Sequence, residues 1–313
     1  MNKTRMLTEG AMMLAIFTVL LWISIYVPVI MIIVQLILIL PFLLYSSKYP
    51  LKSAILLLIG SIMISFLVGP WIATVPFTVL FGTTGMMAGY GVRTGKSKII
   101  IYISSSIVFL FNLVLGFAIA SKFFQIHFLD ELTQMLRSST SQYIEALEKL
   151  GQAPPANLQE QMNEMISMIG SMAPSLLIGT AFFTVWLILV INLPIVKRLG
   201  VDVPKFEPFR KLRFPKSVLW YYLIALILTL VMNPEEGTYL YMVLINGAFI
   251  LQTLLVIQGL SFIFFFAYEK KWPMIVPIIA VVLTFIMPIF LSIVRMLGII
   301  EIGFDLRQRM GNK

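Results

Sequence analysis

The chain has 313 residues, of which 59% are hydrophobic and only 12% are charged. Soluble domains carry about 25% charged residues, and a soluble fold could not cover so much apolar surface. The composition therefore excludes an ordinary water-soluble protein. The chain has no cysteine, which excludes disulfides, thiolate catalysis and Cys-based metal sites. The net charge of +9 would suit nucleic-acid binding, unless its distribution has another cause.

Nine apolar blocks follow one another, and most are long enough to cross a hydrocarbon core of about 30 Å as helices. Short alternating strands, which would indicate a membrane barrel, are absent. The sequence predicts an all-α fold, a polytopic transmembrane bundle of eight or nine helices. The first block lacks a signal-peptide cleavage site and is expected to stay as a helix. The blocks are 11–27, 28–45, 52–69, 72–91, 99–121, 173–196, 217–232, 239–268 and 273–297.

The basic residues gather in alternate loops, which predicts a cytoplasmic N-terminus by the positive-inside rule. The acidic residues lie mostly in the remaining loops. This asymmetry explains the positive charge through contact with anionic lipid, so we expect the bilayer and no nucleic acid as a partner. The expected location is the cell (inner) membrane of a bacterium, with multiple crossings. The inside loops hold Lys3 and Arg5, Lys48 and Lys52, Arg93, Lys96 and Lys98, the bases of 197–216, and Lys270 with Lys271.

The largest outside loop, residues 122–172, is predicted to form two short amphipathic helices separated by a Pro-Pro break at 152–157. Its second half is rich in methionine, with Met162, Met165, Met168 and Met172. A hairpin that caps the bundle or lies on the membrane is the simpler interpretation. A lid or a partner-binding surface is the alternative, because Met-rich faces adapt to varied shapes.

The last apolar block, 273–297, contains Pro273, Pro277 and Pro288. We expect a plain ninth span, which would leave the basic tail outside, against the charge rule. The alternative is a re-entrant hairpin broken at proline and covered by protein. Arg295 is the one base within an apolar block, and snorkelling towards the interface would explain it. A shared helical face with Thr284, Pro288 and Ser292 leaves an anion contact as the alternative.

Neutral amides lie within several apolar blocks, at Gln35, Asn112, Asn192, Asn246, Gln252 and Gln258. Such groups usually hydrogen-bond between helices. Convergence of some of them on a cavity for a polar, uncharged solute is the alternative. Gln35, Asn112 and Gln252 are the candidate solute-cavity residues.

Motifs for enzymatic chemistry are missing: the sequence has no zinc-protease pair, no nucleophile elbow and no phosphate-binding loop. The single histidine, His127, is interpreted as an interfacial residue, because one histidine cannot build a zinc site alone. No carboxylate falls within an apolar block, which argues against a proton-coupled pump. We therefore expect no enzyme, no catalytic or metal-binding residues and no cofactor.

Small residues recur at helical spacing in two places. Gly82, Gly85 and Gly89 share one helical face and are candidates for helix packing. Ala11 and Ala15 form a small-xxx-small patch on the first helix. That patch is a candidate for internal packing or for docking a partner helix.

The order of these elements in roughly residues 5–200 resembles the substrate-binding S components of energy-coupling-factor vitamin transporters. Those proteins have six helices, an Ala-x-x-x-Ala patch that docks the transmembrane T component, and a basic loop after a Gly-rich fourth helix. The matching features here are Ala11 with Ala15, and Gly82–Tyr90 followed by Arg93, Lys96 and Lys98. The resemblance implies a six-helix S-component-like domain over 1–200, including the hairpin 122–172. Residues 201–313 would add a basic cytoplasmic connector, three membrane helices and a short tail.

The whole chain resembles the YybS-like family of uncharacterised bacterial membrane proteins, through the ending Leu297-Gly298, Glu301 and Phe304-Asp305-x-Arg307. That family brings no established activity. The resemblance to S components implies a protein that binds a small organic solute from outside, together with a transmembrane coupling subunit and ATPases. The alternative is a membrane scaffold or regulatory protein that acts through protein partners and transports nothing.

Overall fold

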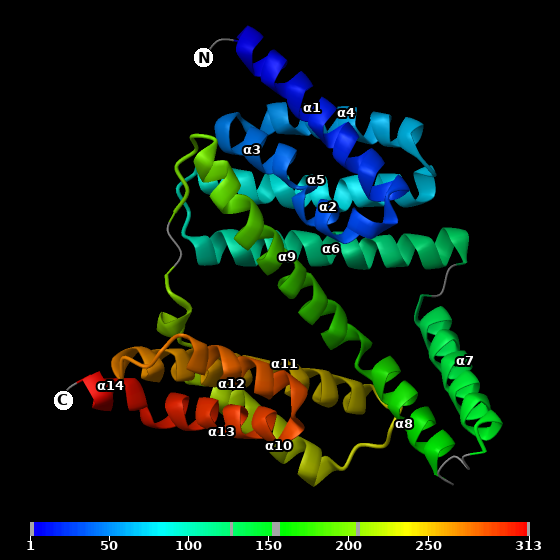
Figure 1. The fold of residues 1–313 in the computed structure, drawn as a ribbon, viewed down its shortest axis with the longest axis vertical. Coiled ribbons are helices and arrows are strands. Elements are labelled where there is room, and N and C mark those ends of the chain that lie inside the picture. Colours follow the sequence, from blue (N-terminus) through cyan, green and yellow to red (C-terminus); the bar gives the residue numbers. More distant parts are fainter. Residues whose placement is uncertain (1–2, 126–127, 152–156, 205–206, 312–313) are drawn as a thin grey trace. The chain divides into compact units, whose positions relative to one another are not determined.

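The computed structural model describes residues 3–125, 128–151, 157–204 and 207–311. Every regular element in these ranges is a helix, which confirms the all-α prediction (Figure 1). The chain divides into two compact units. The first comprises Met1–Leu132 and Leu177–Lys205, and the second comprises Thr133–Leu176 and Phe206–Lys313.

The first unit is built from long apolar helices around one short helix. Its elements are α1 (Lys3–Tyr26), the 3-10 turn η1 (Pro28–Ile30), α2 (Met31–Ile37), α3 (Leu40–Lys48), α4 (Leu51–Val68), α5 (Trp71–Arg93), α6 (Lys98–Phe124) and most of α9 (Ala173–Arg198).

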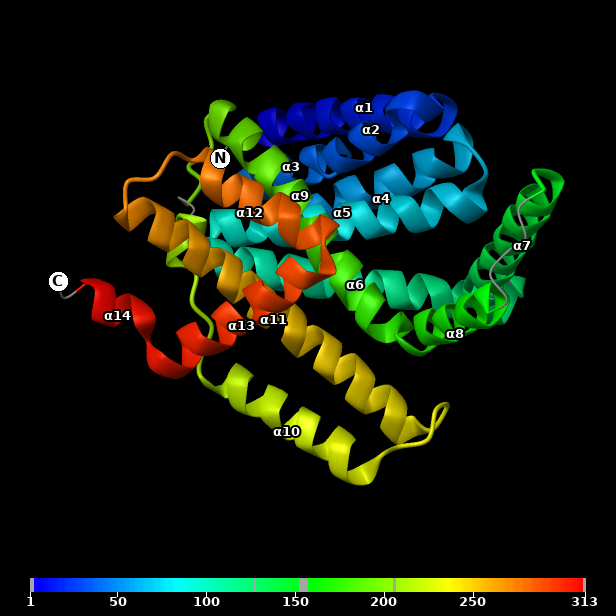
Figure 2. The ribbon, with the colours of Figure 1, turned by 60° about the horizontal axis from the view of Figure 1, so that its bottom comes forward.

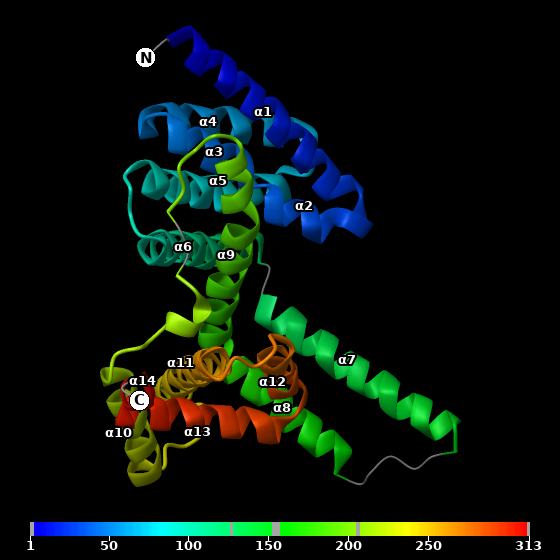
Figure 3. The same ribbon diagram turned by 60° about the vertical axis from the view of Figure 1, so that its left-hand side comes forward.

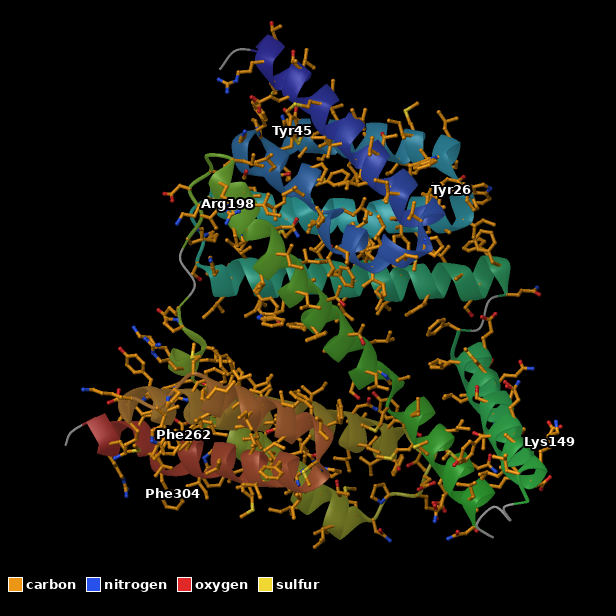
Figure 4. The ribbon with its side chains drawn as sticks, viewed as in Figure 1. Tyr26, Tyr45, Lys149, Arg198, Phe262 and Phe304 are labelled. Carbon is orange, nitrogen blue, oxygen red and sulfur yellow. The ribbon has the colours of Figure 1, made fainter. Side chains whose placement is uncertain are left out.

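Helix α3 is the centre of this unit, and its residues 41–47 are all buried. Because consecutive residues point in all directions around a helix, burial of this whole stretch means that protein surrounds it. Phe42 meets Phe17 of α1 edge to face, with ring centroids 5.1 Å apart. Tyr45 points towards α1 and donates its hydroxyl hydrogen to the Met6 carbonyl at 3.2 Å (Figure 4).

The break between α2 and α3 leaves backbone carbonyls that a continuous helix would have satisfied. Asn192 of α9 supplies a donor for one of them: its Nδ2 lies 2.7 Å from the Leu36 carbonyl oxygen. Asn192 is fully buried. An amide that the sequence places in mid-span thus stabilises an irregular backbone in a neighbouring segment.

The second unit contains the two amphipathic helices of the long loop and the C-terminal helices. Figure 2 shows α10 and α11 side by side, with α13 crossing α11. The elements are α7 (Phe128–Lys149, which begins in the first unit), α8 (Leu158–Ser171), the 3-10 turn η2 (Phe209–Lys211), α10 (Ser217–Met232), α11 (Tyr239–Glu269), α12 (Ile275–Ile286), α13 (Pro288–Phe304) and α14 (Leu306–Gly311).

The expectation of a plain ninth span over 273–297 is wrong. The helix breaks between Ile286 and Pro288, and the helix axis turns by 118° from α12 to α13 (Figure 3). Proline lacks the N–H for the helical hydrogen bond and its ring clashes with the preceding turn, so the chain turns sharply there. The face that Thr284 was expected to share with Arg295 is therefore divided between two helices.

Seven of the described helical segments are long and apolar enough to cross a membrane, and there are eight if the bent pair counts as one span. The count of eight is the lower end of the predicted eight or nine helices. Helix α10 has 16 residues and spans about 24 Å at 1.5 Å per residue, less than a hydrocarbon core of about 30 Å.

The two amphipathic helices predicted for the outside loop are confirmed as α7 and α8. Helix α7 buries none of its residues. Arg137 of α7 donates from Nη1 to Oδ1 of Asn163 in α8 at 3.3 Å. Of the four methionines named in this segment, Met165 and Met168 are 50% exposed, and Met162 and Met172 are partly buried.

Candidate functional site

The crossing of α11 and α13 is the closest helix contact of the second unit. Gly259 and Gly298 lie at the crossing, and a Cβ on either would collide with a carbonyl oxygen of the opposite helix, that of Val294 or Leu255. Because glycine has no side chain, the two helix backbones can touch at this crossing. This approach brings the C-terminal end of α13 against the second half of α11.

A buried ion pair lies beside that crossing. Nε of Arg307 is 3.0 Å from Oε1 of Glu301, and the two side chains are 2% and 4% exposed. The guanidinium also donates to the carbonyls of Arg210 and Leu212 at 2.8 and 3.1 Å, and to Oγ of Ser261 at 3.1 Å. A buried charge is tolerable only with such compensation, because desolvating it is costly.

The basic connector between α9 and α10 is held to α11 by the same network. Ser261 donates its hydroxyl hydrogen to the carbonyls of Phe209 and Leu212 at 2.8 and 2.9 Å. Gln258 accepts the Phe214 N–H at 2.9 Å and donates to the Glu301 carboxylate. These side chains bond to backbone N–H and carbonyl groups of the connector. The described part of the connector forms one short 3-10 turn and otherwise leaves such groups without helical partners.

Both ends of the α12–α13 pair lie at this connector. Helix α12 follows the end of α11. There the Arg210 guanidinium stacks on Tyr268, 3.7 Å from the ring centroid. Helix α13 ends at Asp305, whose carboxylate is 2.7 Å from Nζ of Lys216. The hydrogen bond from Lys216 lowers the pKa of the Asp305 carboxyl. The end of α13 therefore lies beside the connector, whereas a plain ninth span would have placed the tail opposite it.

Arg295 of α13 has a different environment from Arg307. Its Nη1 donates to Oε1 of Gln252 in α11 at 2.9 Å, and the side chain is half-buried. No carboxylate of the described residues forms an ion pair with it. Gln252, predicted to line a solute cavity, is thus the neutral partner of a charged group.

The three candidate solute-cavity residues are not brought together by the bonds they make. Gln35 and Asn112 belong to the first unit, and Gln252 belongs to the second. Asn112 donates to Oγ1 of Thr83 at 3.0 Å and to the Val108 carbonyl at 2.7 Å. Gln35 is half-buried in α2.

The glycine face of α5 lies directly on α3. A Cβ on Gly82 would come within 2.5 Å of Leu58 and 3.3 Å of Phe42, and one on Gly85 would lie 2.9 Å from the Ile39 carbonyl oxygen. A Cβ on Gly89 would collide with the carbonyl oxygen of Leu43. All three positions therefore permit close packing inside the first unit.

Ala11 and Ala15 lie on the exposed side of α1, away from the buried Met13 and Phe17. A groove of about 270 Å³ lies between α1 and α3, and Met13 and Ile16 line it from α1. At its polar end Glu9 meets Arg5 at 2.9 Å and Lys48 at 3.7 Å. The lining residues are Glu9, Met12, Met13, Ile16, Leu40, Pro41, Leu44, Lys48 and Leu199.

Asn246 repeats the role of Asn192 in the second unit. Its Nδ2 donates to the Ser171 carbonyl at 2.8 Å and its Oδ1 accepts the Ser175 N–H at 2.8 Å. It thereby bridges the break between α8 and α9. Sequence reasoning did not find these partners, nor the Glu301–Arg307 pair. The YybS-like ending was the one signal, since it contains Gly298, Glu301, Asp305 and Arg307.

His127 lies outside the described residues. Within the described ranges, no group of three or more His, Cys, Asp or Glu side chains could hold a metal ion.

A polytopic helical membrane protein, with a polar cluster buried among its C-terminal helices, is the class that this architecture defines. The chain belongs to the family described as "Predicted membrane protein (DUF2232)", whose model matches residues 15–302. It is 32% identical over 311 residues to the "Uncharacterized protein YybS" of Bacillus subtilis (strain 168), covering 99% of this chain and 100% of that protein. The predicted YybS-like membership is confirmed. No solved structure matches the chain.

Proposed function

We propose that the chain is the solute-binding membrane subunit of a transport system and works with a second membrane protein docked on α1. The observation that carries this proposal is the exposed pair Ala11 and Ala15, which lie one turn apart on α1. Small residues on an exposed face let another helix approach closely. The resemblance to S components supports a transmembrane coupling subunit with ATPases as the docked partner.

Docking is tested by purifying the tagged chain from its native membrane in mild detergent. We expect a coupling subunit and ATPases to copurify with the wild type. Ala11→Leu with Ala15→Leu should abolish this while leaving the Tm of the isolated chain unchanged. Val19→Leu is the matched control, because Val19 is 58% exposed on the same helix. Copurification that survives the double substitution would place the partner elsewhere.

Solute binding is tested separately by the Tm of the purified chain against vitamins, nucleosides, amino acids and lipid headgroups. A ligand that binds only the folded state adds about 2.7 kcal/mol at 100 times its Kd, which is readily measured. A saturable shift supports the proposal and names the solute class. If no coupling subunit copurifies and no solute stabilises the chain, the transport proposal fails.

A second candidate is a scaffold that contacts protein partners outside the membrane through α7 and α8. The half-exposed Met165 and Met168, together with the absence of buried residues in α7, favour such a surface. Deleting 130–165 should then abolish a protein contact and leave solute binding unchanged. Loss of solute binding on this deletion would instead favour a lid.

A further inference from the structure

We propose that Arg295 and Gln252 form a binding site, within the membrane, for an anionic oxygen group: a carboxylate or a phosphate. The site belongs to the second unit, whereas the α1 surface proposed for docking belongs to the first. It does not require that the chain has a transport partner.

The depth of Arg295 is the first argument. Helix α13 ends at Asp305, which pairs with Lys216 of the charged connector. Arg295 lies about 15 Å before that end along the helix, at a rise of about 1.5 Å per residue, and a hydrocarbon core is about 30 Å thick. Arg295 therefore lies well inside the apolar length of α13 and not at its charged end. Snorkelling was the simpler expectation, but the side chain points across to Gln252 in the middle of α11.

The missing counter-ion is the second argument. Arginine keeps its charge in proteins, and an uncompensated charge within the membrane is costly. Arg307, on the next helix, shows how this chain satisfies a structural arginine: it has a buried carboxylate, two carbonyls and a hydroxyl. Among the described residues Arg295 has one neutral amide oxygen. Its other donors form no hydrogen bond to the part of the chain that the structure describes.

The donor pattern identifies the ligand chemistry. Because Oε1 of Gln252 accepts from Arg295, the amide Nε2 remains as a donor beside the guanidinium. Ser292 lies one turn before Arg295 on the same face of α13 and adds a hydroxyl. Such a set of donors fits an acceptor-only group, and the planar guanidinium fork matches a carboxylate or a phosphate in bidentate geometry.

Two sources could present that group: a small soluble acid, or the phosphate of an anionic lipid. The test uses the purified full chain and measures Tm in two arms. One arm titrates sodium phosphate and sodium benzoate in neutral detergent. The other compares nanodiscs of phosphatidylglycerol with nanodiscs of phosphatidylcholine. Wild type is compared with Arg295→Gln, Arg295→Lys and the exposed control Arg137→Gln.

We expect wild type and Arg137→Gln to show a saturable rise in Tm in at least one arm, and Arg295→Gln to show none. A response in the first arm assigns the site to a soluble acid, and a response in the second assigns it to a lipid headgroup. Arg295→Lys keeps the charge without the fork and should need roughly tenfold more ligand for the same shift.

In neutral detergent without added anion, Arg295→Gln should fold with a Tm equal to or above that of the wild type. The substitution removes a half-buried charge that has no counter-ion. A variant that unfolds there would show that the arginine is structural and would overturn the proposal. The absence of a response in both arms, or an equal response of Arg295→Gln and wild type, would overturn it as well.

Discussion

Gly259 and Gly298 occupy reciprocal positions at the crossing of α11 and α13, where each would press an added Cβ into the other helix's backbone. A backbone carbonyl cannot move aside as the end of a flexible side chain can. The two helices must therefore separate if either glycine gains a side chain. This separation would also pull Glu301 and Arg307 away from the connector that they hold.

Gly298→Ala is expected to lower the stability of the chain by about 1–3 kcal/mol or more, as overpacking a close contact does. The measurement is thermal unfolding of the purified protein in detergent. Gly247→Ala in α11 is the matched control, since nothing lies within 4 Å of its added Cβ. The control should be neutral or stabilise by up to about 1 kcal/mol. Equal effects of the two substitutions would contradict the close crossing.

Arg307→Met should destabilise the second unit by about 3–5 kcal/mol, because it leaves Glu301 charged, buried and unpaired. Glu301→Gln combined with Arg307→Met should recover part of this loss. Exposed Arg309→Met provides the control on the same short helix α14. The comparison is made by thermal unfolding. A double variant as unstable as the sum of its parts would show that the two residues do not act as a pair.

The side of the C-terminus can be tested directly, because the chain has no native cysteine. Single cysteines at Gln308, at Lys211 in the connector and at Glu235 beyond α10 are treated with a membrane-impermeant maleimide in intact cells and in inverted vesicles. Gln308 and Lys211 should react from the same face, because Asp305 binds Lys216. Glu235 should react from the opposite face. Opposite labelling of Gln308 and Lys211 would rule out the re-entrant hairpin.

The Asp305–Lys216 pair predicts a pH dependence. Lys216 holds the pKa of Asp305 below its ordinary value of 3.8. The folded state therefore prefers the ionised carboxyl, so the stabilisation is complete above pH 3.8 and is lost as the pH falls through the lowered pKa. Asp305→Asn keeps a residue that tolerates the left-handed backbone at φ 48°. The difference in Tm between wild type and this variant should shrink in acid, and a constant difference would count against the pair.

Much of the membrane architecture follows from the sequence. The length of each apolar run predicts a helix because backbone groups in lipid must bond within their own segment. Each of the nine blocks corresponds to helical structure. The Pro-Pro break between α7 and α8 lies outside the described residues. The spacing of Gly82, Gly85 and Gly89 places them on one face without reference to any partner. These are properties of neighbouring residues, and the chain's local chemistry determines them.

What only the tertiary structure decided is which distant groups meet. Nothing near Asn192 or Asn246 in sequence indicates that each stabilises a break in another segment. The return of α13 to the connector depends on the fit of Gly298 against Gly259, and Glu301 gains its buried partner only after that turn. Helical periodicity gives the face on which a side chain lies but not the segment opposite it. Hydrogen bonds and ion pairs between segments are therefore decided by packing, and in this chain packing distinguishes the compensated Arg307 from the uncompensated Arg295.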